Sequence, residues 1–158
     1  PLWSRGLGDV YKRQHCDYAL HPTPEREKQV LARHGSPLAD KVGEFDYAWY
    51  NIWEPIERTA LQNQLCVIDG KSAGRGDFHE YHFTSEAKAG YATMPMPSAA
   101  HRFWYFSNME PGEAIVFTQY DSRDGHPLAV PHTSFYDTSV TEALGRRSVE
   151  YRALCVFD

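Results

Sequence analysis

The sequence predicts an all-β protein, a sandwich or jelly roll of short strands with one short helix near the N-terminus. Three observations support this fold class. Short runs rich in aromatic and β-branched residues recur along the chain, turns with Gly, Pro and Asp separate them, and a helical pattern occurs only near the start. A chain of 158 residues with 42% hydrophobic residues has enough apolar surface for one core, so we expect a single domain.

Residues 1–14 differ from the rest of the chain. They show neither helical nor strand periodicity, and they look like the translated adapter tail that is often found at the ends of metagenomic reading frames. We therefore expect residues 1–14 to be a non-native leader and residues 15–158 to be the domain, incomplete at its N-terminus. A genuine irregular arm is the alternative interpretation of this stretch.

The first regular elements are expected directly after this leader. His15–Leu20 has the composition of a short strand. A helix should begin near residues 22–27, with Thr23 as its N-cap and acidic residues in its first turn, and it should end at Gly35. The apolar side of this helix would carry Val30, Leu31 and His34.

The remaining strands are expected at short intervals along the chain. Residues 45–56 are rich in aromatic residues and include Pro55, which favours a strand that ends there. Residues 71–77 contain two glycines and favour a loop, and Glu110–Gly112 favours a tight turn. Further strands are expected at residues 65–69, 80–84, 101–106, 113–120, 128–135 and 148–157.

Composition argues against several classes of partner and site. The net charge is -5 and no basic run occurs, so we expect no nucleic-acid partner. The chain has no apolar run of about 18 residues and no start that resembles a secretion signal, so we expect no membrane span and a cytoplasmic location. The three cysteines are odd in number and far apart, which argues against a disulfide framework and a CxxC zinc site.

A candidate metal site combines the two ends of the chain. His15 and Asp17 are two residues apart, so in a strand their side chains would point to the same face. With His132 they would supply two imidazoles and one carboxylate, a set that suits non-haem Fe(II) and leaves coordination positions open. A rival cluster is His79 with His82, but histidines three residues apart point to opposite faces of a strand.

A candidate anion clamp follows His132 in the sequence. Arg146 and Ser148 would share one face of a strand, and a guanidinium offers two parallel donors to a carboxylate. We expect Arg146 and His132 to lie on neighbouring strands, with Arg152 as the second choice for the clamp. The alternative is that these arginines pair with Glu142 or Glu150 on the surface.

Five segments in their order and spacing resemble a known family. The segments are Asn51–Ile56, His101–Phe106, Glu113–Ser122, Pro131–Phe135 and the pattern Arg146-x-Ser148-x-Glu150-x-Arg152. They resemble the hydroxylase/desaturase family typified by AsaB, which also includes the J component of cephamycin methoxylation and a fungal gibberellin desaturase. The family usually has an arginine where this chain has Glu54, so we expect the contact at that position to differ here.

The resemblance implies a fold, an activity and a set of site residues. The fold would be a double-stranded β-helix, a cupin-like jelly roll. The activity would be the hydroxylation or desaturation of a small, secondary-metabolite-like molecule with Fe(II), 2-oxoglutarate and dioxygen. Fe(II) would be held by His15, Asp17 and His132, and 2-oxoglutarate by Arg146, Ser148 and Arg152. Substrate contacts would come from Asn51, Trp53, His101, Trp104 and Tyr105, although an aromatic run such as residues 101–106 is more often part of a core.

Two other classes of function are also compatible with the sequence. One is a cupin-like metal-binding or small-molecule-binding protein, or a metal dioxygenase that uses no 2-oxoglutarate, in which Arg146 would be dispensable. The other is a non-catalytic accessory subunit that presents substrate to a partner enzyme, in which the metal ligands would be dispensable.

Overall fold

The computed structural model describes residues 14–20, 24–84, 89–142 and 144–157. Most of the expected leader and the expected N-cap Thr23 therefore lie outside the described residues. The helical elements are α2 (Pro24–Arg33) and the 3-10 turns η1 (Ala39–Lys41) and η2 (Arg75–Asp77). The strands are β1 (Asp46–Pro55), β2 (Gln64–Ile68), β3 (Phe78–Thr84), β4 (Ala89–Pro95), β5 (Phe103–Tyr105), β6 (Ile115–Asp121), β7 (His132–Phe135) and β8 (Ser148–Phe157).

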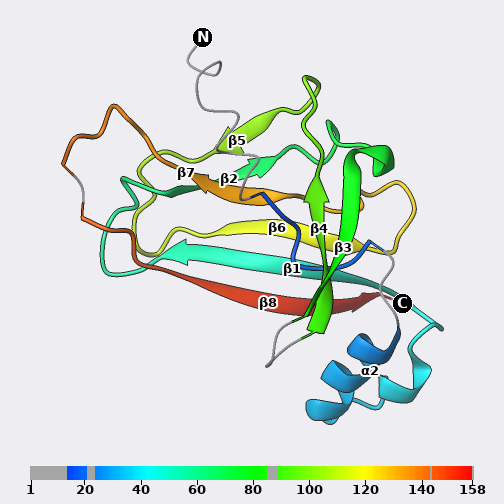
Figure 1. The fold of residues 1–158 in the computed structure, drawn as a ribbon. Coiled ribbons are helices and arrows are strands. Elements are labelled where there is room, and N and C mark those ends of the chain that lie inside the picture. Colours follow the sequence, from blue (N-terminus) through cyan, green and yellow to red (C-terminus); the bar gives the residue numbers. More distant parts are fainter. Residues whose placement is uncertain (1–13, 21–23, 85–88, 143, 158) are drawn as a thin grey trace.

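The strands form two antiparallel three-stranded sheets and a hairpin. One sheet has the order β6-β1-β8, the other has the order β5-β2-β7, and β3 pairs with β4. Figure 1 shows the two sheets as layers, with α2 beside the end of the β1 sheet that lies near the C-terminus of the chain. The architecture is that of an antiparallel sandwich in which sequence-distant strands are neighbours.

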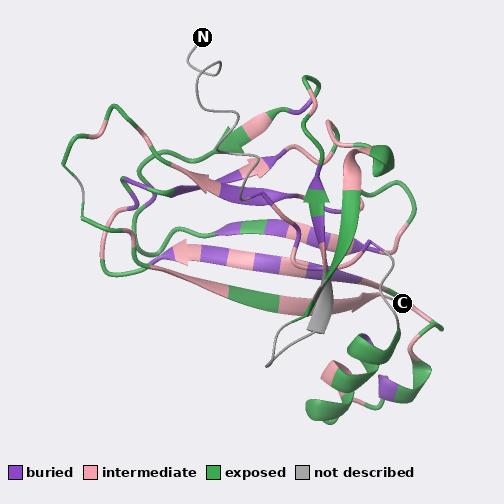
Figure 2. Cartoon of the chain, viewed as in Figure 1, coloured by how far each residue is buried: buried purple, intermediate pink, exposed green. Residues whose placement is uncertain are grey.

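Strand β1 forms the centre of its sheet, and its side chains alternate between the two faces. Trp49, Asn51 and Trp53 are buried, whereas the residues between them are partly exposed, as Figure 2 shows along the strand. The register with β6 shifts between Trp49 and Tyr50, which marks a β-bulge. The inward face of β1 therefore presents two indoles and one buried amide to the interior.

The hydrophobic core lies between the two sheets. One cluster consists of Trp53, Ala60, Leu65, Met109, Ile115 and Phe117. These residues come from β1, β2, β6 and the connections between them, which explains why the aromatic and β-branched runs of the sequence become strands. A smaller cluster of Cys16, Leu20 and Ala129 packs where the N-terminal segment crosses the sandwich.

The run at residues 128–135 contributes to both sheets rather than forming one strand. Val130 N–H donates to Thr118 O of β6 (2.9 Å), and Pro131 O then accepts from Ile68 N–H of β2 (2.9 Å). Only residues 132–135 form β7. The prediction of one strand over 128–135 was therefore too long, because the segment changes sheets at Pro131.

The N-terminal segment links the hairpin to the second sheet. His15 forms an isolated antiparallel bridge with His132 of β7, and Cys16 forms another with Thr93 of β4. The segment at 15–16 thus lies between β7 and β4. Strand β4 was missed by the sequence reasoning, because Ala89–Pro95 is rich in small residues and its strand conformation depends on pairing with β3.

Helix α2 is fixed to the sheet by a polar contact. Glu27 is 1% exposed, and its Oε1 accepts a hydrogen bond from Trp49 Nε1 (3.0 Å). Gly35 has a positive φ of 66° and ends the helix as expected. The prediction that His34 lies on the apolar side was wrong, because His34 is exposed and the buried position of the helix is Glu27. Among the described residues, no helix is long and apolar enough to cross a membrane.

Candidate metal centre

Two histidines meet because their backbones pair. His15 N–H donates to His132 O (3.2 Å), and His132 N–H donates to His15 O (3.0 Å). Residues directly opposite each other in an antiparallel pair place their side chains on the same face within a few ångströms. The two imidazole rings accordingly lie with their centroids 4.5 Å apart, although the residues are distant in sequence.

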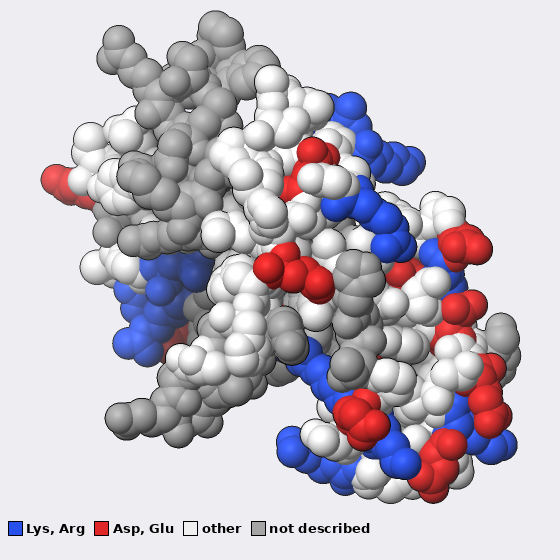
Figure 3. All heavy atoms as spheres, turned by 45° about the vertical axis from the view of Figure 1, so that its right-hand side comes forward, with Lys and Arg blue, Asp and Glu red and all other residues white. Residues whose placement is uncertain are grey.

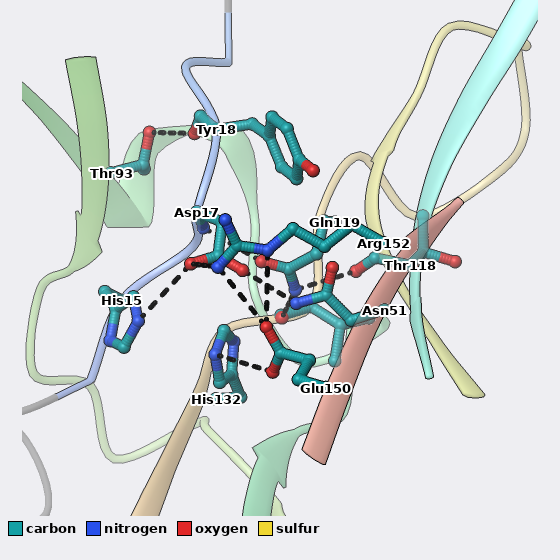
Figure 4. Close-up of polar contacts among 11 residues, drawn as sticks. His15, Asp17, Tyr18, Asn51, Thr93, Thr118, Gln119, His132, Glu150 and Arg152 are labelled. Atoms are coloured by element: carbon teal, nitrogen blue, oxygen red, sulfur yellow. Dashed lines mark hydrogen bonds and ion pairs between the residues drawn. The ribbon is translucent and has the colours of Figure 1, made fainter. Parts of the chain in front are cut away.

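Asp17 reaches the same face from two residues further along. Its Oδ1 lies 3.6 Å from His15 Nε2, as Figure 4 shows. Its backbone N–H donates to Gln119 Oε1 (2.9 Å), and Asn51 Nδ2 donates to its Oδ2 (2.7 Å). Asn51 and Gln119 are buried residues of β1 and β6, so the first sheet fixes the orientation of Asp17.

The surroundings set the protonation states of Asp17 and His132. Burial alone would raise the pKa of Asp17, but hydrogen bonds from His15 and Asn51 and the positive charge of Arg152 hold it well below its usual range. Burial, together with the charges of His15 and Arg152, lowers the pKa of His132 to about 4. At neutral pH the pair is therefore a carboxylate and a neutral imidazole, the forms that bind metal ions.

The three side chains fit a divalent metal ion. One ligand atom from each of His15, Asp17 and His132 lies within 4.8 Å of the other two. Nδ1 of His132 is buried and has no hydrogen-bond partner among the described residues, so its imidazole is not fully satisfied by protein contacts. Two imidazoles and one carboxylate form a set that suits Fe(II), and the side chain of His15 is 43% exposed, so the site is accessible from one side.

A cavity of about 280 Å³ adjoins the histidines, and Trp53, Leu65, Arg146 and Glu150 contribute to its walls. Arg146 places its guanidinium 5.4 Å from the centre of the Trp53 ring and donates to Asn63 O. Burial lowers the pKa of Arg146. The sequence spacing predicted that Arg146 and His132 lie on neighbouring strands, and this was wrong. Arg146 precedes β8, and β8 belongs to the sheet that does not contain β7, the strand of His132.

Two charged residues of β8 complete the surroundings of the histidines. Arg152 Nη2 lies 2.9 Å from Asp17 Oδ1 and 3.3 Å from Glu150 Oε1. Glu150 Oε2 in turn lies 4.0 Å from His132 Nε2. Burial and the negative charge of Asp17 raise the pKa of Glu150. Glu150 was expected to be part of the family pattern at residues 146–152 or a surface partner for arginine, but not to approach the metal ligands. Its two-residue spacing from Arg152 already placed both on one strand face.

The residues predicted to contact substrate fall into two groups. Asn51 and Trp53 lie next to the candidate ligands. Asn51 donates to Asp17, and Trp53 lines the cavity. The other three do not line this cavity. His101 is buried and lies 3.6 Å from Asp77 Oδ2, while Trp104 and Tyr105 of β5 are 59% and 48% exposed. Ser148 is the first residue of β8 and pairs with Pro55.

The rival cluster does not form a metal site in the part of the chain that the structure describes. His79 and His82 are exposed residues of β3. Side chains three positions apart in a strand point to opposite faces, which is the geometry expected from their spacing. His15, Asp17 and His132 form the one group of three possible ligands found among the described residues.

Comparisons with known proteins identify the family of this chain. Residues 7–156 match the protein family described as "Oxidoreductase/YMDC permease-like domain". Among curated relatives, hydroxylase/desaturase efuI of Hormonema carpetanum is 26% identical over 88% of this chain and 50% of its own length. Hydroxylase/desaturase asaB of Aspergillus flavus is 28% identical over 71% of this chain and 56% of its own length. The resemblance to the hydroxylase/desaturase family is thereby confirmed.

A solved structure matches the fold of this chain over most of its length. The iron and alpha-ketoglutarate-dependent endoperoxidase NvfI superimposes with a TM-score of 0.76 at 21% identity, over 94% of this chain and 54% of that chain. The predicted jelly-roll fold is thus confirmed. The chain spans about half the length of the curated relatives it matches.

Proposed function

Because the chain belongs to the Oxidoreductase/YMDC permease-like domain family, we propose that it is the core of an Fe(II)/2-oxoglutarate-dependent hydroxylase or desaturase. Its substrate would be a small molecule of the secondary-metabolite type. The observation that carries the proposal is the convergence of His15, Asp17 and His132 within 4.8 Å beside a cavity that contains an arginine. The relatives named hydroxylase/desaturase support the same reaction class.

Each residue of the centre has a distinct part in this proposal. His15, Asp17 and His132 would hold Fe(II), and Asn51 keeps the Asp17 carboxylate in position by donating to Oδ2. When bound, the metal and 2-oxoglutarate would supply the oxidative chemistry that directs dioxygen to an unactivated C–H group. Arg146 would bind the distal carboxylate of 2-oxoglutarate through its guanidinium, with Ser148 as a further donor.

The cavity walls would position the substrate and exclude water. Trp53 and Leu65 supply apolar surface beside His132, and burial by apolar groups strengthens each polar contact made there. The exposed face of His15 is the side from which a small molecule could approach. Trp104 and Tyr105 lie on the edge strand β5 and would contact only a substrate that extends beyond the cavity. The buried His101 would stabilise the chain next to this strand.

We propose one jelly-roll domain over residues 15–158; the family match begins at residue 7, within the stretch 1–14 that was expected to be a non-native leader. We propose a cytoplasmic location, which the free cysteines Cys16, Cys66 and Cys155 support. Nucleic acid is not a proposed partner, and Figure 3 shows acidic and basic side chains interspersed over the face that includes α2.

An anaerobic titration of the metal-free protein tests the function. Fe(II) is added first and 2-oxoglutarate second, and the weak visible charge-transfer band of the chelate is followed. We expect His132→Ala to abolish the band, because the metal loses one of three ligands. We expect Arg146→Ala to raise the half-saturating 2-oxoglutarate concentration about 10- to 100-fold, because a hydrogen bond to a charged group contributes about 1.5–3 kcal/mol.

Two matched variants serve as controls in this titration. His34→Ala removes an exposed histidine of the helix end, and Arg147→Ala removes the neighbouring arginine that pairs with Glu57 at 3.2 Å. Both should give the band of the parent chain. A band that survives His132→Ala would rule out the proposed ligand set. A band unaffected by Arg146→Ala would rule out Arg146 as the residue that binds 2-oxoglutarate. No band at all would favour the cupin-like metal protein or the accessory subunit over the proposed enzyme.

A further inference from the structure

Arg152 occupies the oxygen of Asp17 that a metal ion would need. Asp17 Oδ1 faces His15 Nε2 at 3.6 Å, and the same oxygen lies 2.9 Å from Arg152 Nη2. Figure 4 shows the guanidinium between Asp17 and Glu150. A divalent cation bound at Oδ1 would therefore lie close to a permanent positive charge, which disfavours binding. In its observed position, Arg152 competes with the metal for this carboxylate.

The structure also contains a second partner for Arg152. Glu150 Oε1 lies 3.3 Å from both Nε and Nη2 of Arg152, and the two residues share one face of β8 because they are two positions apart. The Arg152 side chain is 47% exposed, so it has room to move. Asn51 would continue to hold Asp17 Oδ2 after the arginine left, so the carboxylate would keep its orientation.

We propose that Arg152 is an internal counter-ion that exchanges between two carboxylates. In the metal-free chain it bridges Asp17 and Glu150, and when a divalent cation takes Asp17 Oδ1 it leaves Asp17 and pairs with Glu150 alone. Glu150 thus acts as a positioning residue for metal binding, through Arg152, without being a ligand. This inference rests on the proposed metal centre, and it assigns Arg152 a role other than contact with 2-oxoglutarate.

Isothermal titration of the full chain with Mn²⁺ alone tests the exchange, without 2-oxoglutarate and without activity. Arg152→Gln keeps a hydrogen-bond donor but removes the charge, and we expect it to bind Mn²⁺ about tenfold more tightly than the parent chain. Arg152→Lys keeps the charge and should bind within about twofold of the parent. Glu150→Gln removes the second partner and should bind about tenfold more weakly.

A double variant distinguishes the exchange of Arg152 between carboxylates from independent effects of the Arg152 and Glu150 charges. If Arg152 transfers to Glu150, the loss caused by Glu150→Gln should be several-fold smaller in the Arg152→Gln background than in the parent chain. Equal losses in both backgrounds would mean that the charges act independently and would overturn the exchange. Weaker or unchanged Mn²⁺ binding by Arg152→Gln would also overturn it, because Arg152 would then serve only to orient Asp17.

Thermal unfolding provides a second readout and checks that the variants fold. Arg152→Gln should lower the unfolding midpoint of the metal-free chain, because Asp17 and Glu150 then repel each other, and Mn²⁺ should raise that midpoint more than it does in the parent. A smaller metal-induced rise in Arg152→Gln than in the parent would contradict the exchange. Absence of Mn²⁺ binding by the parent would refute the metal centre itself, whereas binding abolished by His132→Ala but not tightened by Arg152→Gln would refute the exchange alone.

Discussion

Trp49 connects helix α2, the sheet and the segment that carries two of the candidate ligands. Its indole is 4% exposed, and its Nε1 donates to the buried Glu27 at 3.0 Å. The same ring stacks on the ring of Tyr18, the residue that follows Asp17, with the two ring centroids 5.0 Å apart. The guanidinium of Arg26 lies 3.9 Å from the Tyr18 ring and closes this stack. Replacement of Trp49 by Phe would keep an aromatic ring but remove the donor.

The expected cost of Trp49→Phe can be worked out from these contacts. A hydrogen bond to a charged group contributes about 1.5–3 kcal/mol, and an unpaired buried carboxylate costs more. Oε2 of Glu27 already has no partner among the described residues, so Trp49→Phe would leave both oxygens unpaired. We expect the free energy of unfolding to fall by about 3 kcal/mol, which corresponds to a decrease in unfolding midpoint of about 6–12 °C for a chain of this size.

Chemical and thermal denaturation measure this loss, and the chain offers a matched control. Trp104 is 59% exposed on the edge strand β5, so Trp104→Phe should change stability by less than about 0.5 kcal/mol. Glu27→Gln keeps an acceptor for the indole and removes the buried charge, so Trp49→Phe should cost less in that background. Equal losses for Trp49→Phe and Trp104→Phe would refute the role assigned to the Glu27 contact.

Two further predictions concern stability away from the metal centre. A Cβ added at Gly70 would lie 2.7 Å from the Cβ of Pro127, so Gly70→Ala should cost about 1–3 kcal/mol in denaturant unfolding, whereas Gly76→Ala meets no atom within 4 Å and should be nearly neutral. Asp121 is buried and accepts from Arg123 at 2.8 Å, which outweighs burial and lowers the pKa of Asp121. Its contribution to stability is therefore present above the ordinary carboxyl pKa of about 4 and is lost as pH falls through the lowered value. Asp121→Asn should cost about 1–3 kcal/mol at pH 7 and should show a smaller loss of stability between pH 5 and pH 3 than the parent chain, as measured by urea unfolding at each pH.

The elements that local sequence could predict are those with a strong periodic pattern. Ser148–Phe157 forms β8 with the expected bounds, and the aromatic run at 45–56 forms β1 one residue shorter at each end. Strand β4 could not be predicted, because Ala89–Pro95 has weak strand propensity and becomes a strand through its partners β3 and Cys16. Whether Ala89–Pro95 forms a strand therefore depends on its pairing with β3 and Cys16, which its own composition does not indicate.

The candidate site shows the same division. The two-residue spacing of His15 and Asp17 predicted that their side chains share a face, and the structure places them on one face. That His132 joins them depends on a backbone bridge between segments more than a hundred residues apart, which spacing alone cannot reveal. The contact of Arg152 with Asp17 is equally non-local, so the arginine was considered for an anion clamp or a surface ion pair instead.

Arg146 and Arg152 have different roles in the proposal, because the charges of the centre must balance. Asp17, Glu150, Arg146 and Arg152 carry formal charges that cancel, and a partly buried site tolerates little excess charge. A divalent cation would give the centre a net charge of about +2, and the dianion of 2-oxoglutarate would restore neutrality. Under the proposed function, metal binding before 2-oxoglutarate is therefore favoured, since the dianion would otherwise meet two carboxylates. Arg152 then serves the metal step through Glu150, and Arg146 remains in the cavity wall for the anion.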